Sequence, residues 1–579
     1  MQINRNIFFS EALISFLASK KIRHAVLSPG SRNTPLTFAA AGNKKISTYS
    51  LIDERAAGFF ASGLARSTKK PVILICTSGT AAAEYLPAVI ESFFQKIPLI
   101  VITADRPAKL RGTGANQTIY QNNIYGDHVI KAWDVPQPEP DQRYARKWSG
   151  VLGELSDLID RGLNGPVHLN LQFDKPFEPD AFTDNLAAAE IRMLKKSLRI
   201  TSKSGKKLPP AYKMSSELNK KITSVFHFVI FCGPDAVKSK EDSAYIGRLA
   251  DAFGAPVLCD AFSGISKQHQ SRHTFHSFHL YAGNLISEIK PDIIFQFGNL
   301  PVSKAGEEIL SMKGVTRVVV NREGEKRGDY GNTAIVCTAD IASFAKETIR
   351  AAKNKKFSDT SYYERIHALE QAAEEAKRHS LESILFTEAE IIKTVAENCT
   401  SRNLLMIGNS MPPRDLDYIS GLIRGSLNLF HNRGASGIDG IIASAAGIAA
   451  GSVSRTFLII GDVSFFYDLT SLQIIKQNNL NLTIVLLNNG GGKIFEMLPV
   501  KRFPEMIRQY YHTPAGVNYR KLISAFDIRY DNPKSVSELT EVLGRRITGC
   551  NVIECKTSIK DTIRLRKAAE EKFSSNLIV

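Results

Sequence analysis

Residues 486–495 read LLNNGGGKIF and follow the apolar run LTIV at 482–485. This leucine-rich and β-branched stretch predicts a buried strand, which stops at Asn488 and Asn489. Three consecutive glycines carry a high entropy cost when they become ordered, and a plain turn needs only one of them. We therefore expect a ligand or another backbone segment to come close to the chain here.

A second stretch, RTFLIIGDVSFFYDLTSL at 455–472, has the same form. Its apolar strand ends at Gly461 and Asp462, and a helical pattern follows. One strand–helix–strand crossover separates Asp462 from Asn489, so both are expected at the ends of neighbouring parallel strands. A carboxylate, a carboxamide oxygen and a glycine carbonyl suit Mg²⁺, and glycines admit a diphosphate. Either motif alone reads equally well as a turn or a helix cap.

Short apolar runs alternate with helical patterns through most of the chain, which predicts α/β architecture with mostly parallel sheets flanked by helices. The 579 residues are too many for one core and suggest roughly three or four domains. Composition divides the chain into a first α/β domain at 1–185, a linker at 186–222, a central α/β domain at 223–350, a helical connector at 351–385 and a third α/β domain at 386–579.

The bulk composition narrows the functional class. No run approaches the ~18 apolar residues of a membrane helix, so no membrane span is expected. Seven scattered cysteines without a CxxC pair favour a reduced, cytoplasmic protein. The net charge of +17 leaves a basic nucleic-acid-binding protein as the non-enzyme alternative. However, the lysine clusters at 195–196, 203–207 and 353–356 match no nucleic-acid-binding motif and read as solvated linkers.

The GD and NN pair resembles the cofactor motif of thiamin diphosphate enzymes, which hold the cofactor through a divalent metal. The resemblance implies a three-domain thiamin diphosphate-binding fold, with Mg²⁺ as the metal and Mn²⁺ as the alternative. It implies Asp462, Asn489 and the Gly491 carbonyl as metal ligands, and a diphosphate site lined by Gly461, Asp462, Val463 and Ser464. Val463 stands where a glycine is usual in this motif.

The segment LIDERAAGFFASGLARS at 51–67 resembles the glutamate segment of the family's pyrimidine-binding domain. So do TSGTAAAEYLPAVIES at 77–92 and TADRP at 103–107. The resemblance implies that Glu54 is the catalytic acid that hydrogen-bonds the aminopyrimidine ring. Taken alone, Asp53 and Glu54 would read as acidic residues that favour a helix N-terminus electrostatically.

Four further strings resemble a narrower family, the 2-succinyl-5-enolpyruvyl-6-hydroxy-3-cyclohexene-1-carboxylate synthases of menaquinone biosynthesis. They are LSPGSRNTPL (27–36), ANQTIYQ (115–121), GNSMPPRDLD (408–417) and NRGASGIDG (432–440). The resemblance implies a transferase that decarboxylates 2-oxoglutarate and adds the succinyl carbanion equivalent to isochorismate. An acetolactate-synthase-like carboligase or decarboxylase of 2-oxoacids is the enzyme alternative.

Both of these substrates are dianions, and arginine forks bind carboxylates bidentately. The chain places four arginines at strand or loop tips: Arg32, Arg106, Arg414 and Arg433. Any one of them alone is more often a surface residue. The resemblance adds neutral and basic substrate contacts at Asn116, Gln117, Ser410 and Lys304. It also places Ser410 and Ile438 at the cofactor, with Ile438 between the two cofactor rings, although a core isoleucine is the simpler reading.

The family resemblance also implies an assembly. The pyrimidine-binding domain of one subunit meets the diphosphate-binding domain of another in these enzymes. We therefore expect a homodimer or a dimer of dimers with shared active sites, in which Glu54 and Asp462 of one site come from different chains.

Overall fold

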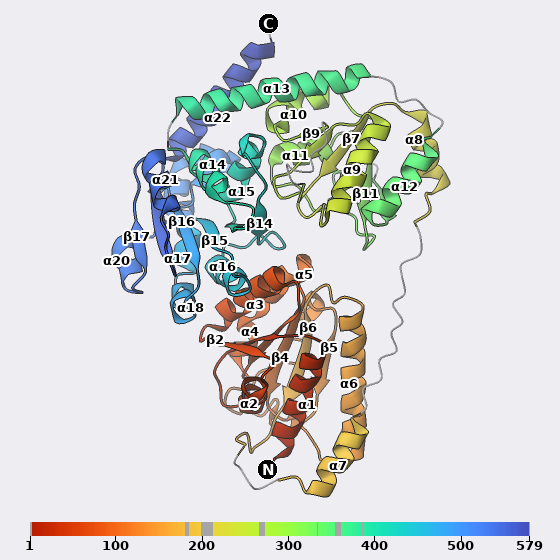
Figure 1. The fold of residues 1–579 in the computed structure, drawn as a ribbon, viewed down its shortest axis with the longest axis vertical. Helices are drawn as coiled ribbons and strands as arrows, with labels where there is room; N and C mark the ends of the chain where they lie inside the picture. The colour runs from red at the N-terminus through yellow and green to blue at the C-terminus, as the bar shows by residue number, and fades with distance from the viewer. Residues whose placement is uncertain are drawn as a thin grey trace.

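The computed structural model describes residues 3–179, 185–198, 212–265, 273–332, 334–353, 360–384 and 386–577. It contains three six-stranded sheets in which every paired strand is parallel. Helices flank each sheet, and the three units are visible in Figure 1. The predicted α/β class with parallel sheets is confirmed.

The first unit has the strand order β2-β1-β3-β4-β6-β5. Its strands are β1 (His24–Leu27), β2 (Ser47–Ser50), β3 (Val72–Cys76), β4 (Leu99–Asp105), β5 (Ala132–Val135) and β6 (Val167–Gln172). Its helices are α1 (Arg5–Ser19), α2 (Thr34–Gly42), α3 (Glu54–Thr68), α4 (Thr80–Glu84), α5 (Leu86–Phe94), α6 (Gln142–Asp160) and α7 (Ala188–Ser197).

The second unit has the order β12-β11-β10-β7-β8-β9, that of doubly wound nucleotide-binding sheets. Its strands are β7 (Phe228–Cys232), β8 (Val257–Cys259), β9 (Thr274–Phe275), β10 (Ile293–Phe297), β11 (Thr316–Asn321) and β12 (Ala334–Thr338). Its helices are α8 (Ser216–Ser224), α9 (Lys240–Phe253), α10 (Phe278–Ser287), α11 (Lys304–Leu310) and α12 (Ile341–Ala351).

The third unit has the order β14-β13-β15-β16-β18-β17, which repeats the topology of the first unit strand for strand. Its strands are β13 (Leu404–Ile407), β14 (Asn428–His431), β15 (Thr456–Gly461), β16 (Leu482–Asn488), β17 (Arg529–Asp531) and β18 (Asn551–Lys556). Its helices are α14 (Glu388–Asn398), α15 (Met411–Ile419), α16 (Ile441–Ala450), α17 (Asp462–Tyr467), α18 (Ser471–Gln477), α19 (Pro504–Met506), α20 (Tyr519–Ser524), α21 (Val536–Gly544) and α22 (Ile559–Leu577).

Two segments connect the units. Leu186 and Leu194, in the part of the predicted linker around α7, pack into the core of the first unit. The long helix α13 (Thr360–Ser383) runs across the second and third units, beside α22 (Figure 1). Residues 199–211, 354–359 and 385 of the predicted linker and connector lie outside the described residues. The exact domain boundaries stay a prediction.

One hydrophobic core is shared by the first and third units, where α3 lies against α16 (Figure 1). Both helices are rich in alanine and glycine, so their backbones approach closely. A Cβ on Gly63 of α3 would lie 2.0 Å from the Ser444 carbonyl oxygen, and one on Gly447 of α16 would lie 2.0 Å from that of Phe60. The two glycines therefore set the distance between the units.

Among the residues that the structure describes, no helix is both long enough and apolar enough to cross a membrane.

Candidate active site

The carboxyl ends of β15 and β16 bring Asp462 and Gly491 together, as the crossover predicts. The Gly491 amide donates to Asp462 Oδ2 at 2.7 Å, and the Val463 amide donates to Oδ1 at 2.9 Å. Asp462 is 5% exposed, and burial raises the pKa of its carboxyl although these amides oppose the rise. A buried carboxylate held by backbone donors has oxygen lone pairs left for a cation.

Asn489 lies two residues before Gly491, and the two polar atoms of its side chain have different surroundings. Its Nδ2 donates to Glu388 Oε1 at 2.7 Å. Its Oδ1 is buried and has no hydrogen-bond partner within the described part of the chain. A buried acceptor without a donor is costly unless a cation or another ligand satisfies it. The donor set of Asp462, Asn489 and the Gly491 carbonyl therefore fits a hard divalent metal ion.

The glycine triplet is explained by a close backbone contact. Gly490 and Gly491 have φ angles of 81° and 118°, which L side chains rarely adopt. A Cβ on Gly491 would lie 2.0 Å from the carbonyl oxygen of His512, and the Gly492 amide donates to that same oxygen at 2.6 Å. The segment around His512 thus closes over the turn, a contact the sequence did not reveal.

The other predicted cofactor residues surround the same strand ends. Gly461 ends β15, and Ser464 is buried in the first turn of α17. Ser410 precedes α15 with a φ of 78°. Strands β13 and β15 are neighbours at the point where the strand order reverses, which is where ligands of such sheets bind.

The loop at 432–440, which carries Arg433 and Ile438, is held from two sides. Asn409 Nδ2 donates to the carbonyls of Asn432 and Gly437, both at 2.6 Å. From the first unit, Glu91 of α5 accepts the amides of residues 434, 435 and 436 at 2.7, 2.7 and 3.2 Å. Glu91 is 3% exposed, and sequence reasoning missed it because its partners lie far away in the chain.

The four predicted arginines form two pairs. Arg32 and Arg106 lie in the first unit, and Arg414 and Arg433 lie in the third unit. Arg414 donates to the Ser410 carbonyl at 2.6 Å, and the pKa of its guanidinium is lowered by burial and by nearby Arg433. Burial and Arg106 lower the pKa of Arg32 to about 10. Two like charges held this close favour an anion between or beside them.

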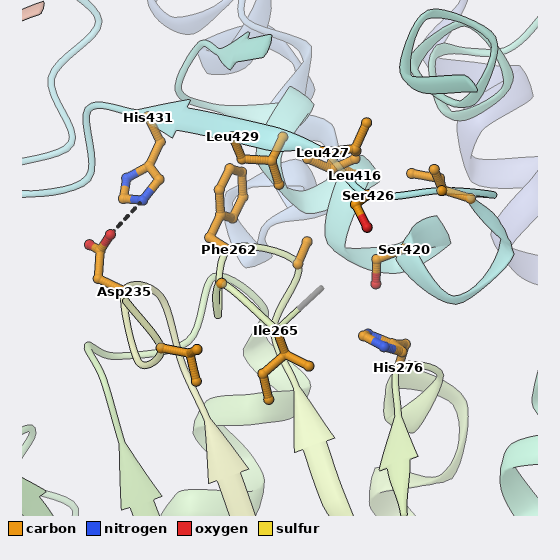
Figure 2. A pocket seen from close by; sticks show the side chains of 15 residues that line it. Asp235, Phe262, Ile265, His276, Leu416, Ser420, Ser426, Leu427, Leu429 and His431 are labelled. Carbon is orange, nitrogen blue, oxygen red and sulfur yellow. Dashed lines mark ion pairs between the residues drawn. The ribbon is translucent and has the colours of Figure 1, made fainter. Parts of the chain in front are cut away.

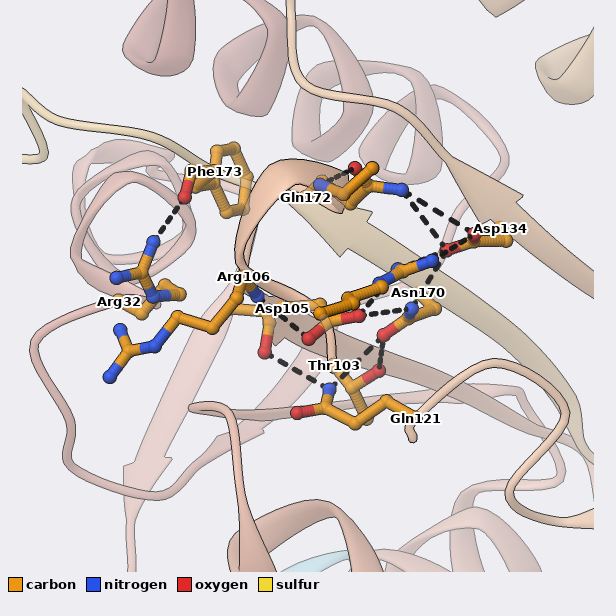
Figure 3. A network of polar contacts seen from close by, with 12 residues as sticks. Arg32, Thr103, Asp105, Arg106, Gln121, Asp134, Asn170, Gln172 and Phe173 are labelled. Atoms are coloured by element: carbon orange, nitrogen blue, oxygen red, sulfur yellow. Dashed lines mark hydrogen bonds and ion pairs between the residues drawn. The ribbon is translucent and has the colours of Figure 1, made fainter. Parts of the chain in front are cut away.

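Figure 3 shows how the pair in the first unit is supported. Buried Asp105 accepts from the Arg106 amide at 2.7 Å and from Asn170 Nδ2 at 2.9 Å. Arg32 donates to the Phe173 carbonyl and lies over the Phe177 ring, with its Cζ 4.7 Å from the centroid. The network leaves both guanidinium groups directed to the same side of the sheet (Figure 3).

Two of the neutral predicted residues, Asn116 and Gln117, lie in a turn that contacts Arg106. The Arg106 side chain donates to the Asn116 carbonyl at 2.9 Å. Gln117 has a φ of 56° and donates through Nε2 to the Ser78 carbonyl at 2.9 Å. The exposed turn at 116–117 is thus folded back onto the ends of β3 and β4.

Glu54 is the first residue of α3 and follows the N-cap Asp53. It is half-buried, and burial raises the pKa of its carboxyl, with Asp53 and Glu84 raising it further. Its neighbour Arg55 pairs with Asp468 of the third unit at 3.1 Å. No hydrogen bond or ion pair joins Glu54 to Asp462 among the described residues.

Lys304 is the one predicted substrate residue that the second unit carries. It begins α11 in the second unit, where its side chain is 86% exposed and pairs with Glu308 at 3.3 Å.

A cavity of about 220 Å³ lies between the second and third units (Figure 2). Its walls expose polar and apolar surface about equally, with Phe262 and Ile265 on one side and Leu429 on the other. Asp235 and His431 form an ion pair at 3.5 Å at its edge. His431 ends β14, directly before the 432–440 loop, so one edge of the cavity adjoins that loop.

Comparisons with known proteins agree with this geometry. Residues 8–124 match the model of the thiamine pyrophosphate enzyme N-terminal TPP binding domain, and residues 424–555 match that of the C-terminal TPP binding domain. The matched segments lie within the first and third units and include Glu54 and Asp462. They confirm the three-domain thiamin diphosphate-binding fold expected from the motifs.

Curated relatives match over nearly the whole chain. The 2-succinyl-5-enolpyruvyl-6-hydroxy-3-cyclohexene-1-carboxylate synthase of Geobacillus kaustophilus is 32% identical over 96% of both chains. That of Listeria innocua is 32% identical over 98% of this chain and 97% of its own. That of Halorubrum lacusprofundi is 31% identical over 98% and 97%. The chain therefore belongs to the 2-succinyl-5-enolpyruvyl-6-hydroxy-3-cyclohexene-1-carboxylate synthase family of thiamin diphosphate-dependent enzymes.

Proposed function

We propose that this chain decarboxylates 2-oxoglutarate and adds the resulting succinyl carbanion equivalent to isochorismate. The products are CO₂ and 2-succinyl-5-enolpyruvyl-6-hydroxy-3-cyclohexene-1-carboxylate, an intermediate of menaquinone biosynthesis. The observation that carries the proposal is near-full-length similarity to synthases of that name, together with a metal-type donor set at the strand ends of the third unit.

Asp462, Asn489 and the Gly491 carbonyl hold the divalent metal, Mg²⁺ or Mn²⁺, that anchors the cofactor diphosphate. The orphaned Asn489 Oδ1 supports this assignment, because a metal would satisfy it. The backbone of Gly461 and Val463 and the hydroxyl of Ser464 surround the diphosphate at the N-terminus of α17. Ser410 and Ile438 lie on the loops that follow β13 and β14, where they contact the cofactor.

Thiamin diphosphate supplies the electron sink for decarboxylation. Glu54 holds a proton on its carboxyl and donates it in a hydrogen bond to the aminopyrimidine ring. The raised pKa of Glu54 supports this role, because partial burial favours the protonated, donating form.

The four arginines bind the substrate carboxylates and orient the reacting groups. Paired positive charges at Arg32 with Arg106 and at Arg414 with Arg433 support this role. Asn116, Gln117 and Ser410 add neutral hydrogen bonds. Lys304 would have to leave its ion pair with Glu308 to reach a substrate.

The active enzyme is a homodimer or a dimer of dimers, with sites shared between chains. Apolar side chains near both Glu54 and Asp462 are exposed in the single chain, which supports a second subunit packing over each of these regions. Ile52, two residues before Glu54, is 75% exposed, and Phe466 and Tyr467, shortly after Asp462, are 43% and 55% exposed. All seven cysteines are free thiols, which supports a reducing, cytoplasmic environment.

The direct test supplies 2-oxoglutarate, thiamin diphosphate and Mg²⁺ with and without isochorismate, and follows CO₂ release and the condensed product. We expect condensation to require isochorismate and to be lost in Asp462→Asn and Glu54→Gln. Turnover of pyruvate without isochorismate would instead indicate an acetolactate-synthase-like carboligase.

Mixing Glu54→Ala with Asp462→Ala subunits tests the shared sites. Hybrid dimers should recover activity at one of their two sites. Absence of recovery in a mixture shown to exchange subunits would refute sharing.

A further inference from the structure

A buried carboxylate lies directly behind the proposed metal ligand Asn489. Glu388 begins α14 and is 1% exposed. Its Oε1 accepts from Asn489 Nδ2 at 2.7 Å and from the Thr557 hydroxyl at 3.0 Å. Thr557 follows β18, and its amide donates to the Asn488 carbonyl at 3.0 Å. Glu388 therefore ties α14 to the ends of β16 and β18.

This contact decides which way the Asn489 carboxamide points. A carboxylate oxygen that already accepts from a hydroxyl can only accept again, so the asparagine must turn its nitrogen toward it. Asn489 Oδ1 is then directed to the opposite side, where it lies without a donor among the described residues. An asparagine that could rotate freely would present its amino group to the metal in part of the molecules.

A charged pair formed by Asp415 and Arg566 lies near Glu388. Asp415 of α15 lies close enough to Glu388 for the two carboxyl groups to interact electrostatically, and it accepts from Arg566 at 2.7 Å.

We propose that Glu388 is a positioning residue that fixes the Asn489 carboxamide with its oxygen toward the metal. The inference rests on the proposed metal site, and it assigns Glu388 no contact with substrate or cofactor. Groups behind metal ligands commonly change metal affinity by about 10- to 100-fold when they are removed.

The test measures Mn²⁺ affinity in the presence of thiamin diphosphate, by electron paramagnetic resonance of the free ion. Glu388→Met removes the acceptor and should weaken Mn²⁺ binding about 10- to 100-fold. Glu388→Gln can keep an oxygen toward Asn489 and its amino group toward Asp415, so it should restore near-native affinity. Glu554→Met is the matched control, because buried Glu554 accepts from the adjacent Asn488 at 2.6 Å. It should leave Mn²⁺ affinity unchanged.

Combining these changes with Asn489→Asp distinguishes a loss of carboxamide orientation from a general disturbance of the fold. Asn489→Asp presents an oxygen in either orientation, so adding Glu388→Met to that variant should cost no further affinity. Thr557→Val, which removes one of the two bonds to Oε1, gives a milder variant if Glu388→Met does not fold. It should lose a few-fold in affinity when residue 489 is the native asparagine, and nothing when it is combined with Asn489→Asp.

Equal losses in the native chain and in the Asn489→Asp variant, or native affinity in Glu388→Met, would overturn the inference. Asp462→Asn reports on the metal site itself. If that variant binds Mn²⁺ normally, the proposed metal site is wrong; if it loses binding while Glu388→Met keeps it, only the role of Glu388 is wrong.

Discussion

The carboxylate of Glu91 should control the 432–440 loop, and Glu91→Gln tests this with little change of shape. The carboxylate accepts three loop amides, at 2.7, 2.7 and 3.2 Å. Glutamine keeps one acceptor oxygen and turns an amino group toward the donors on the other side. Hydrogen bonds to charged groups contribute about 1.5–3 kcal/mol each, but the amides of exposed Ala435 and Ser436 can regain water. We expect a loss of about 2 kcal/mol in the free energy of unfolding.

The loop carries Arg433 and Ile438, so the loss should also appear in substrate binding. The KM for isochorismate should rise more than kcat falls, while Mn²⁺ affinity stays native because the metal residues lie on other loops. Urea unfolding and steady-state kinetics measure the two effects.

Glu370→Gln is the matched control. Buried Glu370 likewise accepts two backbone amides, those of His276 and Ser277 in the second unit, at 2.7 and 2.8 Å, and none from the loop. It should lose similar stability with no change in KM. If Glu91→Gln lowers stability without raising KM, as this control should, or changes neither stability nor KM, Glu91 does not control the loop.

Three further outcomes are expected. Gly491→Ala should abolish Mn²⁺ binding and lower the melting temperature, since its Cβ would lie 2.0 Å from the His512 carbonyl oxygen; normal Mn²⁺ titration would contradict this. Burial lowers the pKa of His168 to about 3, so its neutral form is preferred on folding, and stability is lost as the pH falls below about 6.5 toward 3. His168→Gln should therefore reduce the slope of unfolding free energy against pH between those two pH values. An unchanged slope would show that His168 does not cause this loss of stability. Gly63→Ala should cost several kcal/mol, about 3 or more, because a backbone carbonyl of α16 blocks the new methyl group, whereas exposed Gly42→Ala, with nothing within 4 Å, should be neutral or stabilising.

The closeness of Asp462 to the turn at 489–491 could be predicted from the sequence because it depends on two neighbouring strands. Asp462 and Asn489 each follow a strand, and parallel neighbouring strands place their carboxyl ends together. The arginine pairs were predicted only as single residues, because the packing that brings Arg414 to Arg433 depends on two separate loops.

The supporting carboxylates could not be predicted. Glu91 and Glu388 look like ordinary helix residues in the sequence, and their partners are more than a hundred positions away or belong to another unit. The matching topology of the first and third sheets was also hidden, since strand order is set by crossovers and leaves no repeated sequence. The His512 contact at Gly491 is likewise a tertiary contact.

The core shared by α3 and α16 has a consequence for biosynthesis. The apolar face of α3 has its partner on a helix that the ribosome makes much later. At about 5–20 residues per second, the roughly 370 residues between the two helices take roughly 20–75 s to synthesise. During that time the apolar, glycine-containing face of α3 has no helix packed against it. We therefore expect the nascent chain to depend on chaperone protection of α3 until α16 has been synthesised and packs against it.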